Sequence, residues 1–287
     1  MRAKGAQVTL RDTFAAALTP LRDSGARLDE DAFEPYAAFL LEGGVAGILA
    51  GGTTGEGIAL DPDERLRSVE LFSRAGLVVI AHCGAQTTAT TVRLAESAGE
   101  AGAAAVAVIA PPYFRLDEQA LVAHFTAAAH AAEPLPFYVY EFAAASGYPV
   151  PPAVVLELRE RVPNLVGLKV SDAPWDAFSP YLIDGLDVFV GPEALIGQGM
   201  GAGAVGAVSA LASAFPQRVA AAVADPTGAE AAGMAELRAA VEAYPRHAAL
   251  KRVVASKGVP IREDVRAPLR PLTDDERRSL DAWLASS

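Results

Sequence analysis

Eight short apolar runs recur along the 287-residue chain, and this repeat limits the folds that the chain can form. The runs do not alternate apolar with polar residues, as is typical of parallel strands covered on both faces. They begin roughly 18 to 32 residues apart, which leaves room for a crossover between successive strands. The predicted strands are Phe14–Leu18, Val45–Ala50, Leu77–Ala81, Ala104–Ala110, Pro136–Tyr140, Leu165–Lys169, Leu186–Val190 and Ala204–Ser209.

Amphipathic segments lie between these runs. Residues 33–41 place apolar side chains at helical spacing, and the glycine pair at 43–44 ends that helix. Asp61, Pro62 and Glu64 form a helix start, with a capping residue, a proline at the first position and a reciprocal carboxylate. Further helices are expected from about Thr88 to Gly102, from near Asp117 and from Pro151-Pro152.

Strands that alternate with helices form either a closed (β/α)8 barrel or an open, doubly wound sheet. Eight strands is the barrel number, and 287 residues is an ordinary barrel length. The glycine-rich fingerprint of a dinucleotide-binding sheet does not follow Phe14–Leu18. We therefore predict an α/β fold, a (β/α)8 TIM barrel over residues 1–220. A helical extension over residues 221–287 is expected to pack on it as part of a single structural unit.

The charge balance excludes some classes of partner. The chain has 24 Lys and Arg against 35 Asp and Glu, a net charge of −11. An acidic surface repels nucleic acid and anionic membranes, so neither is expected as a partner. The one cysteine, Cys83, cannot form an internal disulfide, and Met1–Arg11 lacks the apolar core of a signal peptide. These features predict a cytoplasmic protein.

One uncharged stretch, Ala194–Phe215, is long enough to be compared with a membrane span. Its many glycines are unfavourable in an isolated spanning helix. A short helix, a turn and a buried strand is the preferred interpretation.

In a barrel the active site is built at the C-terminal ends of the strands, so Lys169 is a candidate catalytic residue. A buried ammonium must be desolvated or paired, for example with Asp172, and a lysine that reaches the rim is the structural alternative. A desolvated amine can instead attack a ketone to form a Schiff base. Tyr140 ends the preceding strand at the same rim, where its phenol can relay protons; a buried core tyrosine is the alternative.

The segment Gly51–Gly57 directly follows the second run and contains Thr53, Thr54 and Glu56. Its glycines can expose successive N–H groups, and its threonines add hydroxyl donors, so it can hold a small anion. A polyphosphate loop would require a lysine, which this segment lacks, and Glu56 carries the wrong charge for that ligand. A plain turn between strand and helix is the structural alternative.

Metal and serine chemistry are not supported by the sequence. The histidines are His82, His124, His130 and His247, and they show no metal-ligand spacing. His82 and Cys83 end a strand, but adjacent strand residues point to opposite faces. A nucleophile elbow is absent as well. We expect neither metal nor cofactor.

Several motifs together resemble the dihydrodipicolinate synthase / N-acetylneuraminate lyase family of class I pyruvate aldolases. They occur in order over most of the chain. They are Leu18-Thr19-Pro20, Gly52-Thr53-Thr54-Gly55-Glu56 with Leu60 and Glu64-Arg65, Pro111-Pro112-Tyr113-Phe114, Tyr140, Gly167-Leu168-Lys169, Gly191 and Gly206-Ala207-Val208-Ser209.

The resemblance implies specific roles. Lys169 would form an imine with a 2-oxo acid, typically pyruvate, and Tyr140 would relay protons with help from Thr53. Thr54 and Thr53 would hold the pyruvate carboxylate in the loop that begins at Gly52, and the Val208 carbonyl would lie near the imine. The family also suggests a homotetramer.

Other positions depart from the family pattern and leave the second substrate open. Ala145 replaces an arginine that grips a carboxylate in dihydrodipicolinate synthases, Phe114 replaces a relay tyrosine, and Val170 stands where an acid is common. A sugar-acid aldolase or lyase is therefore expected, with dihydrodipicolinate synthase as the alternative enzyme. The alternative that is not an enzyme is a sensor that binds 2-oxo acids, although such a protein would not need Lys169 and Tyr140. The direction of the reaction stays open.

Overall fold

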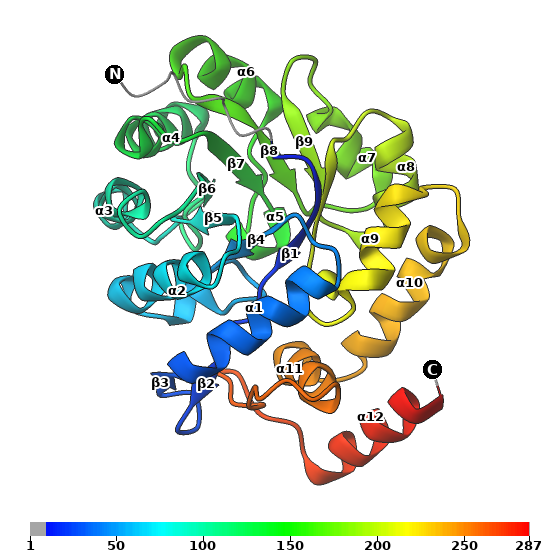
Figure 1. Ribbon diagram of the computed structural model, residues 1–287. Coiled ribbons are helices and arrows are strands. Elements are labelled where there is room, and N and C mark those ends of the chain that lie inside the picture. Colours follow the sequence, from blue (N-terminus) through cyan, green and yellow to red (C-terminus); the bar gives the residue numbers. More distant parts are fainter. Residues whose placement is uncertain (1–9, 287) are drawn as a thin grey trace, which may run out of the picture.

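The computed structural model describes residues 10–286, and its eight parallel strands close into a barrel with helices around it (Figure 1). The strands follow the order β1-β10-β9-β8-β7-β6-β5-β4, and β4 pairs with β1 to close the ring. They are β1 Asp12–Ala16, β4 Gly47–Ala50, β5 Val79–His82, β6 Ala105–Ile109, β7 Phe137–Glu141, β8 Leu165–Val170, β9 Asp187–Val190 and β10 Gly206–Ser209. Each lies at a predicted run, which confirms the TIM barrel.

Side chains from alternate strand positions point to opposite sides of the barrel wall. Phe14, Ile80, Tyr138 and Phe189 belong to a cluster inside the barrel. Their strand neighbours, such as Val139, belong to the larger core between the wall and the helices. Both sides of each strand are thus buried, which explains why the runs are apolar without alternation.

Helices connect most of the strands. They are α1 Phe33–Glu42, α2 Pro62–Arg74, α3 Thr88–Ala98, α4 Glu118–Ala132, α5 Ala143–Ser146, α6 Pro152–Arg161, α7 Trp175–Phe178, α8 Ile196–Gly201, α9 Pro216–Ala224, α10 Ala229–Glu242, α11 Arg246–Ser256 and α12 Asp274–Ser286. The start of α2 is as predicted, since the backbone N–H of Asp61 donates to Glu64 Oε2 at 3.1 Å. A small hairpin, β2 Leu21–Arg22 with β3 Arg27–Leu28, was not predicted.

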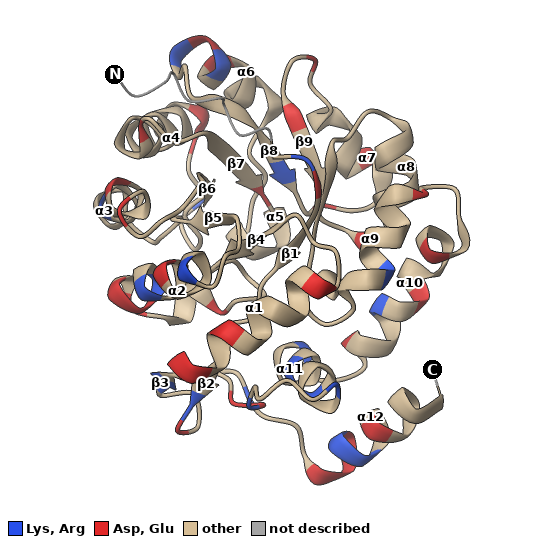
Figure 2. Ribbon diagram, viewed as in Figure 1, with Lys and Arg blue, Asp and Glu red and all other residues tan. Residues whose placement is uncertain are grey.

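The uncharged stretch from 194 to 215 forms α8 and then the buried strand β10, as the preferred interpretation expected. Within residues 10–286 the structure has no helix that is both long and apolar enough to cross a membrane. The N-terminal segment Met1–Arg11, for which no signal peptide is expected, lies mostly in residues 1–9, outside the described residues. Acidic and basic residues are mixed on the outer helices, whereas the strands are mostly uncharged (Figure 2).

Helices α10, α11 and α12 follow the barrel and lie together along one side of it (Figure 1). The predicted boundary at residue 220 falls within α9, and the division into barrel and extension stays a prediction. A buried ion pair joins this region to the barrel. Lys251 Nζ on α11 lies 2.6 Å from Glu56 Oε1, and both side chains are fully buried. The other oxygen of Glu56 accepts the backbone N–H of Arg266 at 2.6 Å.

Replacement of Lys251 with methionine should lower the free energy of unfolding by about 3–5 kcal/mol, because Glu56 would stay buried without its charged partner. Urea denaturation followed by circular dichroism measures this change. The matched control is Arg161→Met on α6, which breaks an exposed pair with Glu157 at 2.6 Å and should cost less than about 1 kcal/mol. Equal losses in the two variants would contradict a stabilising role for the buried pair.

Candidate active site

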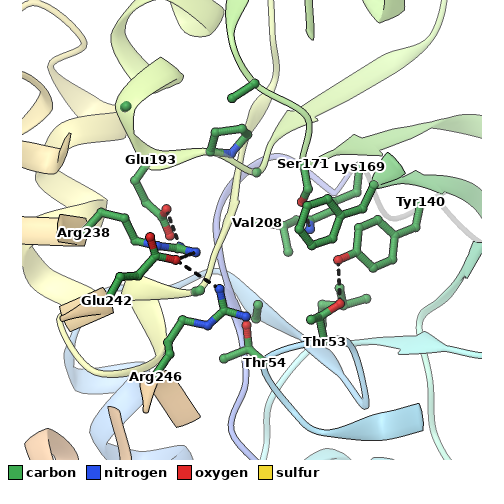
Figure 3. Close-up of a pocket in the computed structure, with 18 residues that line it drawn as sticks. Thr53, Thr54, Tyr140, Lys169, Ser171, Glu193, Val208, Arg238, Glu242 and Arg246 are labelled. Atoms are coloured by element: carbon green, nitrogen blue, oxygen red, sulfur yellow. Dashed lines mark hydrogen bonds and ion pairs between the residues drawn. The ribbon is translucent and has the colours of Figure 1, made fainter. Parts of the chain in front are cut away.

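A cavity of about 260 Å³ opens at the C-terminal ends of the strands (Figure 3). Lys169 from β8, Tyr140 from β7 and Val208 from β10 line it, together with Thr53 and Thr54 from the loop after β4. The structure therefore brings together these candidate residues from four separate parts of the chain. The remaining candidate, Gly52, lines a neighbouring cavity of about 290 Å³.

Lys169 is 6% exposed and lies directly across from Tyr140 in the pairing of β7 with β8. Its Nζ lies 3.9 Å from the centre of the Tyr140 ring and donates a hydrogen bond to Ser171 Oγ. Asp172, the partner considered from sequence, instead accepts the backbone N–H of Ala143 at 2.9 Å. The amine is thus held in the cavity by a neutral hydroxyl and an aromatic face.

The hydroxyl of Tyr140 lies 3.0 Å from Thr53 Oγ1, and either oxygen can donate the hydrogen bond (Figure 3). Thr53 is itself fixed through its backbone, since its carbonyl oxygen lies 3.0 Å from Nε2 of His247 on α11. Two hydroxyls in contact beside an amine can pass a proton between them. Tyr140 is buried and also lies on the cavity wall, so its position is compatible with a proton relay.

The conformation of the loop from 51 to 57 depends on close backbone contacts. Gly51 has a φ of 66°, and a Cβ on Gly57 would lie 1.7 Å from the Gly51 oxygen. Thr19 Oγ1 donates to the Gly55 oxygen at 2.6 Å and anchors the loop to the end of the first strand. The glycines therefore allow the loop to fold tightly and to present its threonines to the cavity.

His82 and Cys83 do not line the cavity that contains Lys169. His82 Nδ1 lies 2.9 Å from the Gly51 oxygen, and its ring meets the Tyr140 ring edge to face at 5.6 Å. Burial, with a smaller contribution from the Arg65 charge, lowers the pKa of His82 to about 3, so the ring is neutral. Burial also raises the pKa of Cys83 to about 12. His82 therefore supports the tyrosine from behind, and Cys83 is part of the outer core.

A charged wall of the cavity was missed by the sequence reasoning. It comprises Glu193, which follows β9, Arg238 and Glu242 of α10, and Arg246 of α11. Arg238 donates to Glu193 at 2.8 Å and lies 2.7 Å from Glu242, which also accepts from Arg246 at 3.3 Å. Residues 238 and 242 of α10 are four apart, which is the spacing of an ion pair on one helix face, but this spacing does not show which face of the helix packs against the barrel.

The departures from the family pattern lie elsewhere. Ala145 is exposed and lines the neighbouring, mainly apolar cavity, and Phe114 is 69% exposed. Arg115, the arginine next to Phe114 in sequence that could replace the missing one at position 145, is exposed and does not line the Lys169 cavity. Arg238 and Arg246 are the arginines that line the Lys169 cavity among the described residues.

Comparison with known proteins agrees with this geometry. Residues 9–287 match the model of the dihydrodipicolinate synthetase family. An uncharacterized DapA-like lyase from Chloroflexus aurantiacus is 32% identical, with 95% of each chain covered. A 4-hydroxy-tetrahydrodipicolinate synthase from Thermus thermophilus is 36% identical over 70% of this chain and 69% of its own. The structure of N-acetylneuraminate lyase from Proteus mirabilis is 27% identical and superposes with a TM-score of 0.86, covering 96% of this chain and 98% of its own.

The matched residues span nearly the whole chain and include the barrel, the cavity and the C-terminal helices. The chain therefore belongs to the dihydrodipicolinate synthetase family of class I pyruvate aldolases, and it is a lyase of that family.

Proposed function

We propose that the protein adds pyruvate to an aldehyde, or releases it from a hydroxylated 2-oxo acid of the sugar-acid type, through a Schiff base on Lys169. The observation that carries this proposal is the buried Lys169 amine, which lies beside the hydrogen-bonded hydroxyls of Tyr140 and Thr53 in one cavity. A sensor for 2-oxo acids needs no amine at that position.

In the proposed mechanism, the neutral amine of Lys169 attacks the C2 carbonyl of pyruvate, and loss of water gives a protonated imine. The imine withdraws electrons, so the adjacent methyl group loses a proton to form an enamine. The enamine carbon attacks the aldehyde carbon, whose oxygen is protonated as the new C–C bond forms. Hydrolysis of the imine then releases the product and the amine, and cleavage follows the same steps in reverse.

The other candidate residues complete this mechanism. Tyr140 transfers protons with Thr53 as its hydrogen-bond partner, while Thr53 and Thr54 hold the pyruvate carboxylate at the loop that Gly52 begins. Val208 lines the same cavity, and its carbonyl would lie near the imine nitrogen. We propose that the chain needs no metal and no further cofactor, since the protonated imine itself stabilises the carbanion.

Aspartate semialdehyde should be a poorer substrate than glyceraldehyde. Its carboxylate has no arginine at position 145, and each arginine of the Lys169 cavity lies beside a glutamate that would repel a second anion. A missing charge-assisted hydrogen bond costs about 1.5–3 kcal/mol, roughly ten- to a hundredfold in kcat/KM. Both kcat/KM values are measured at equal pyruvate. If aspartate semialdehyde is preferred by about tenfold or more, the protein is a dihydrodipicolinate synthase, as the relative from Thermus thermophilus is named.

We also infer a homotetramer, as the resemblance to the family suggests, and a cytoplasmic location, as the single cysteine suggests. Large apolar side chains are exposed beside the neighbouring cavity. Ile58 is 62% and Leu269 is 37% exposed on its lining, and Tyr113, which follows Pro112 of that lining, is 84% exposed. Contact with a second copy would remove this surface from water.

A further inference from the structure

The cavity has two ends of different chemistry. Lys169 and Tyr140 lie at one end, and the charged wall lies at the opposite end (Figure 3). The wall is defined by Glu193, Arg238, Glu242 and Arg246. Because pyruvate would be held at the Lys169 end, the part of the substrate derived from the aldehyde would extend toward this wall.

Glu193 and Arg238 are the two members of the wall that are held by several short contacts, although Arg238 Nε, like Arg246 Nε, is buried without a hydrogen-bond partner among the described residues. Glu193 is 2% exposed, and it accepts hydrogen bonds from Ser209 Oγ at 2.8 Å, from the backbone N–H of Leu211 at 3.0 Å and from Arg238 at 2.8 Å. Arg238 is held on its other side by Glu242. These bonds tie Arg238 to the end of β10 and leave it a fixed support for the rest of the wall.

Glu242 and Arg246 keep hydrogen-bonding capacity. Arg246 contacts Glu242 only at 3.3 Å, a long hydrogen bond, and its buried Nε has no hydrogen-bond partner among residues 10–286. Glu242 is the most accessible member, with 48% of its side chain exposed. A donor and an acceptor thus lie next to each other at the end of the cavity.

The charges of the cavity balance without a second anion. Two arginines face two glutamates in the wall. At the other end, the protonated imine of Lys169 would balance the pyruvate carboxylate. A further carboxylate or phosphate on the aldehyde would add an uncompensated negative charge beside Glu242. The hydroxyl groups of a neutral aldehyde can instead donate a hydrogen bond to Glu242 and accept one from Arg246.

We propose that Glu242 and Arg246 determine specificity by binding the hydroxyl groups of an uncharged, hydroxylated aldehyde. The proposal rests on the proposed function and adds to it the recognition of the second substrate by the C-terminal helices α10 and α11. Arg238 and Glu193 are positioning residues that hold Glu242 in place.

The test compares D-glyceraldehyde with propanal, which has the same three-carbon chain without hydroxyl groups. Glu242→Gln and Arg246→Gln should each lower kcat/KM for glyceraldehyde by about ten- to a hundredfold, and for propanal by no more than about threefold. The matched control is Glu230→Gln, also on α10, which breaks a pair with Arg218 at 2.8 Å outside the cavity. This control should leave kcat/KM for both aldehydes unchanged.

Borohydride trapping of pyruvate, done without aldehyde, separates the two proposals. Failure of trapping in the wild type overturns the proposed function. Normal trapping with an unchanged ratio of glyceraldehyde to propanal in both variants overturns the specificity proposal alone. An equal loss with both aldehydes also overturns it, since a structural role would act on both.

Glyceraldehyde 3-phosphate tests whether the wall prefers a neutral or an anionic aldehyde. The wild type should use it no better than glyceraldehyde, because Glu242 repels the phosphate. A preference of tenfold or more for the phosphate, lost in Arg246→Gln, would show that the wall binds an anion and would overturn the proposal.

Discussion

Replacement of Lys169 with alanine is expected to abolish turnover and to leave the barrel folded. The side chain supplies the amine of the proposed imine, and no other lysine lines the cavity among the described residues. In another enzyme with a covalent intermediate, loss of the nucleophile lowers kcat by on the order of 10⁶-fold. Removal of the Lys169 side chain does not leave an unpaired carboxylate, since its hydrogen-bond partner is the hydroxyl of Ser171. Release of pyruvate from a sugar acid measures the change in kcat.

The control for this variant is Lys257→Ala. Lys257 Nζ donates to the Ala214 oxygen at 2.7 Å, and the residue does not line the cavity. Its replacement should leave turnover within about threefold of the wild type, as is usual for a residue outside the reacting site. Appreciable turnover by a folded Lys169→Ala enzyme would contradict the covalent mechanism.

Replacement of Tyr140 with phenylalanine should lower kcat by roughly 10²–10⁴-fold, the range for loss of general acid–base catalysis. The ring contacts with Lys169 and His82 stay, so the fold and pyruvate binding should be kept. The lost atom is the hydroxyl that lies 3.0 Å from Thr53 Oγ1. Thr53→Val should change kcat in the same direction. Steady-state kinetics give kcat, and trapping with borohydride reports pyruvate binding.

Tyr138→Phe provides a matched comparison on the same strand. Tyr138 also points into the barrel, where it packs against Phe189 with 5.8 Å between ring centres, but it does not line the cavity. Its loss of a hydroxyl should change kcat by no more than a few fold. If the two variants are equally active, Tyr140 is a core residue and the proton relay lies elsewhere.

The fold could be predicted because a parallel strand that is buried on both faces is a continuous run of apolar residues. Each such run can be recognised in the sequence without knowledge of the others. Their exact ends could not be predicted. The first run, Phe14–Leu18, was placed two residues late because Asp12 pairs with Gly206 through backbone atoms, which carry no side-chain signal. The hairpin of β2 and β3 has two residues in each strand, too few for a period to be recognised.

The reactive end of the cavity could be predicted for a similar reason. Neighbouring parallel strands end at the same rim, so Tyr140 and Lys169 had to lie close together, and they are direct partners in the sheet. The charged wall could not be predicted. It depends on how α10 packs on the barrel, which brings Arg238 next to Glu193, 45 residues earlier in the chain. Ser171 was missed because nothing in its sequence position tells that its hydroxyl turns toward the amine.

The most direct test of the proposed imine is reduction with borohydride in the presence of pyruvate, followed by peptide mass mapping. Lys169 should carry the reduced pyruvate adduct, and the Lys169→Ala enzyme should carry none. The same experiment with Tyr140→Phe should still label Lys169, since that variant keeps the amine. An adduct on Lys251 or Lys257, or no adduct on the wild type, would contradict the account.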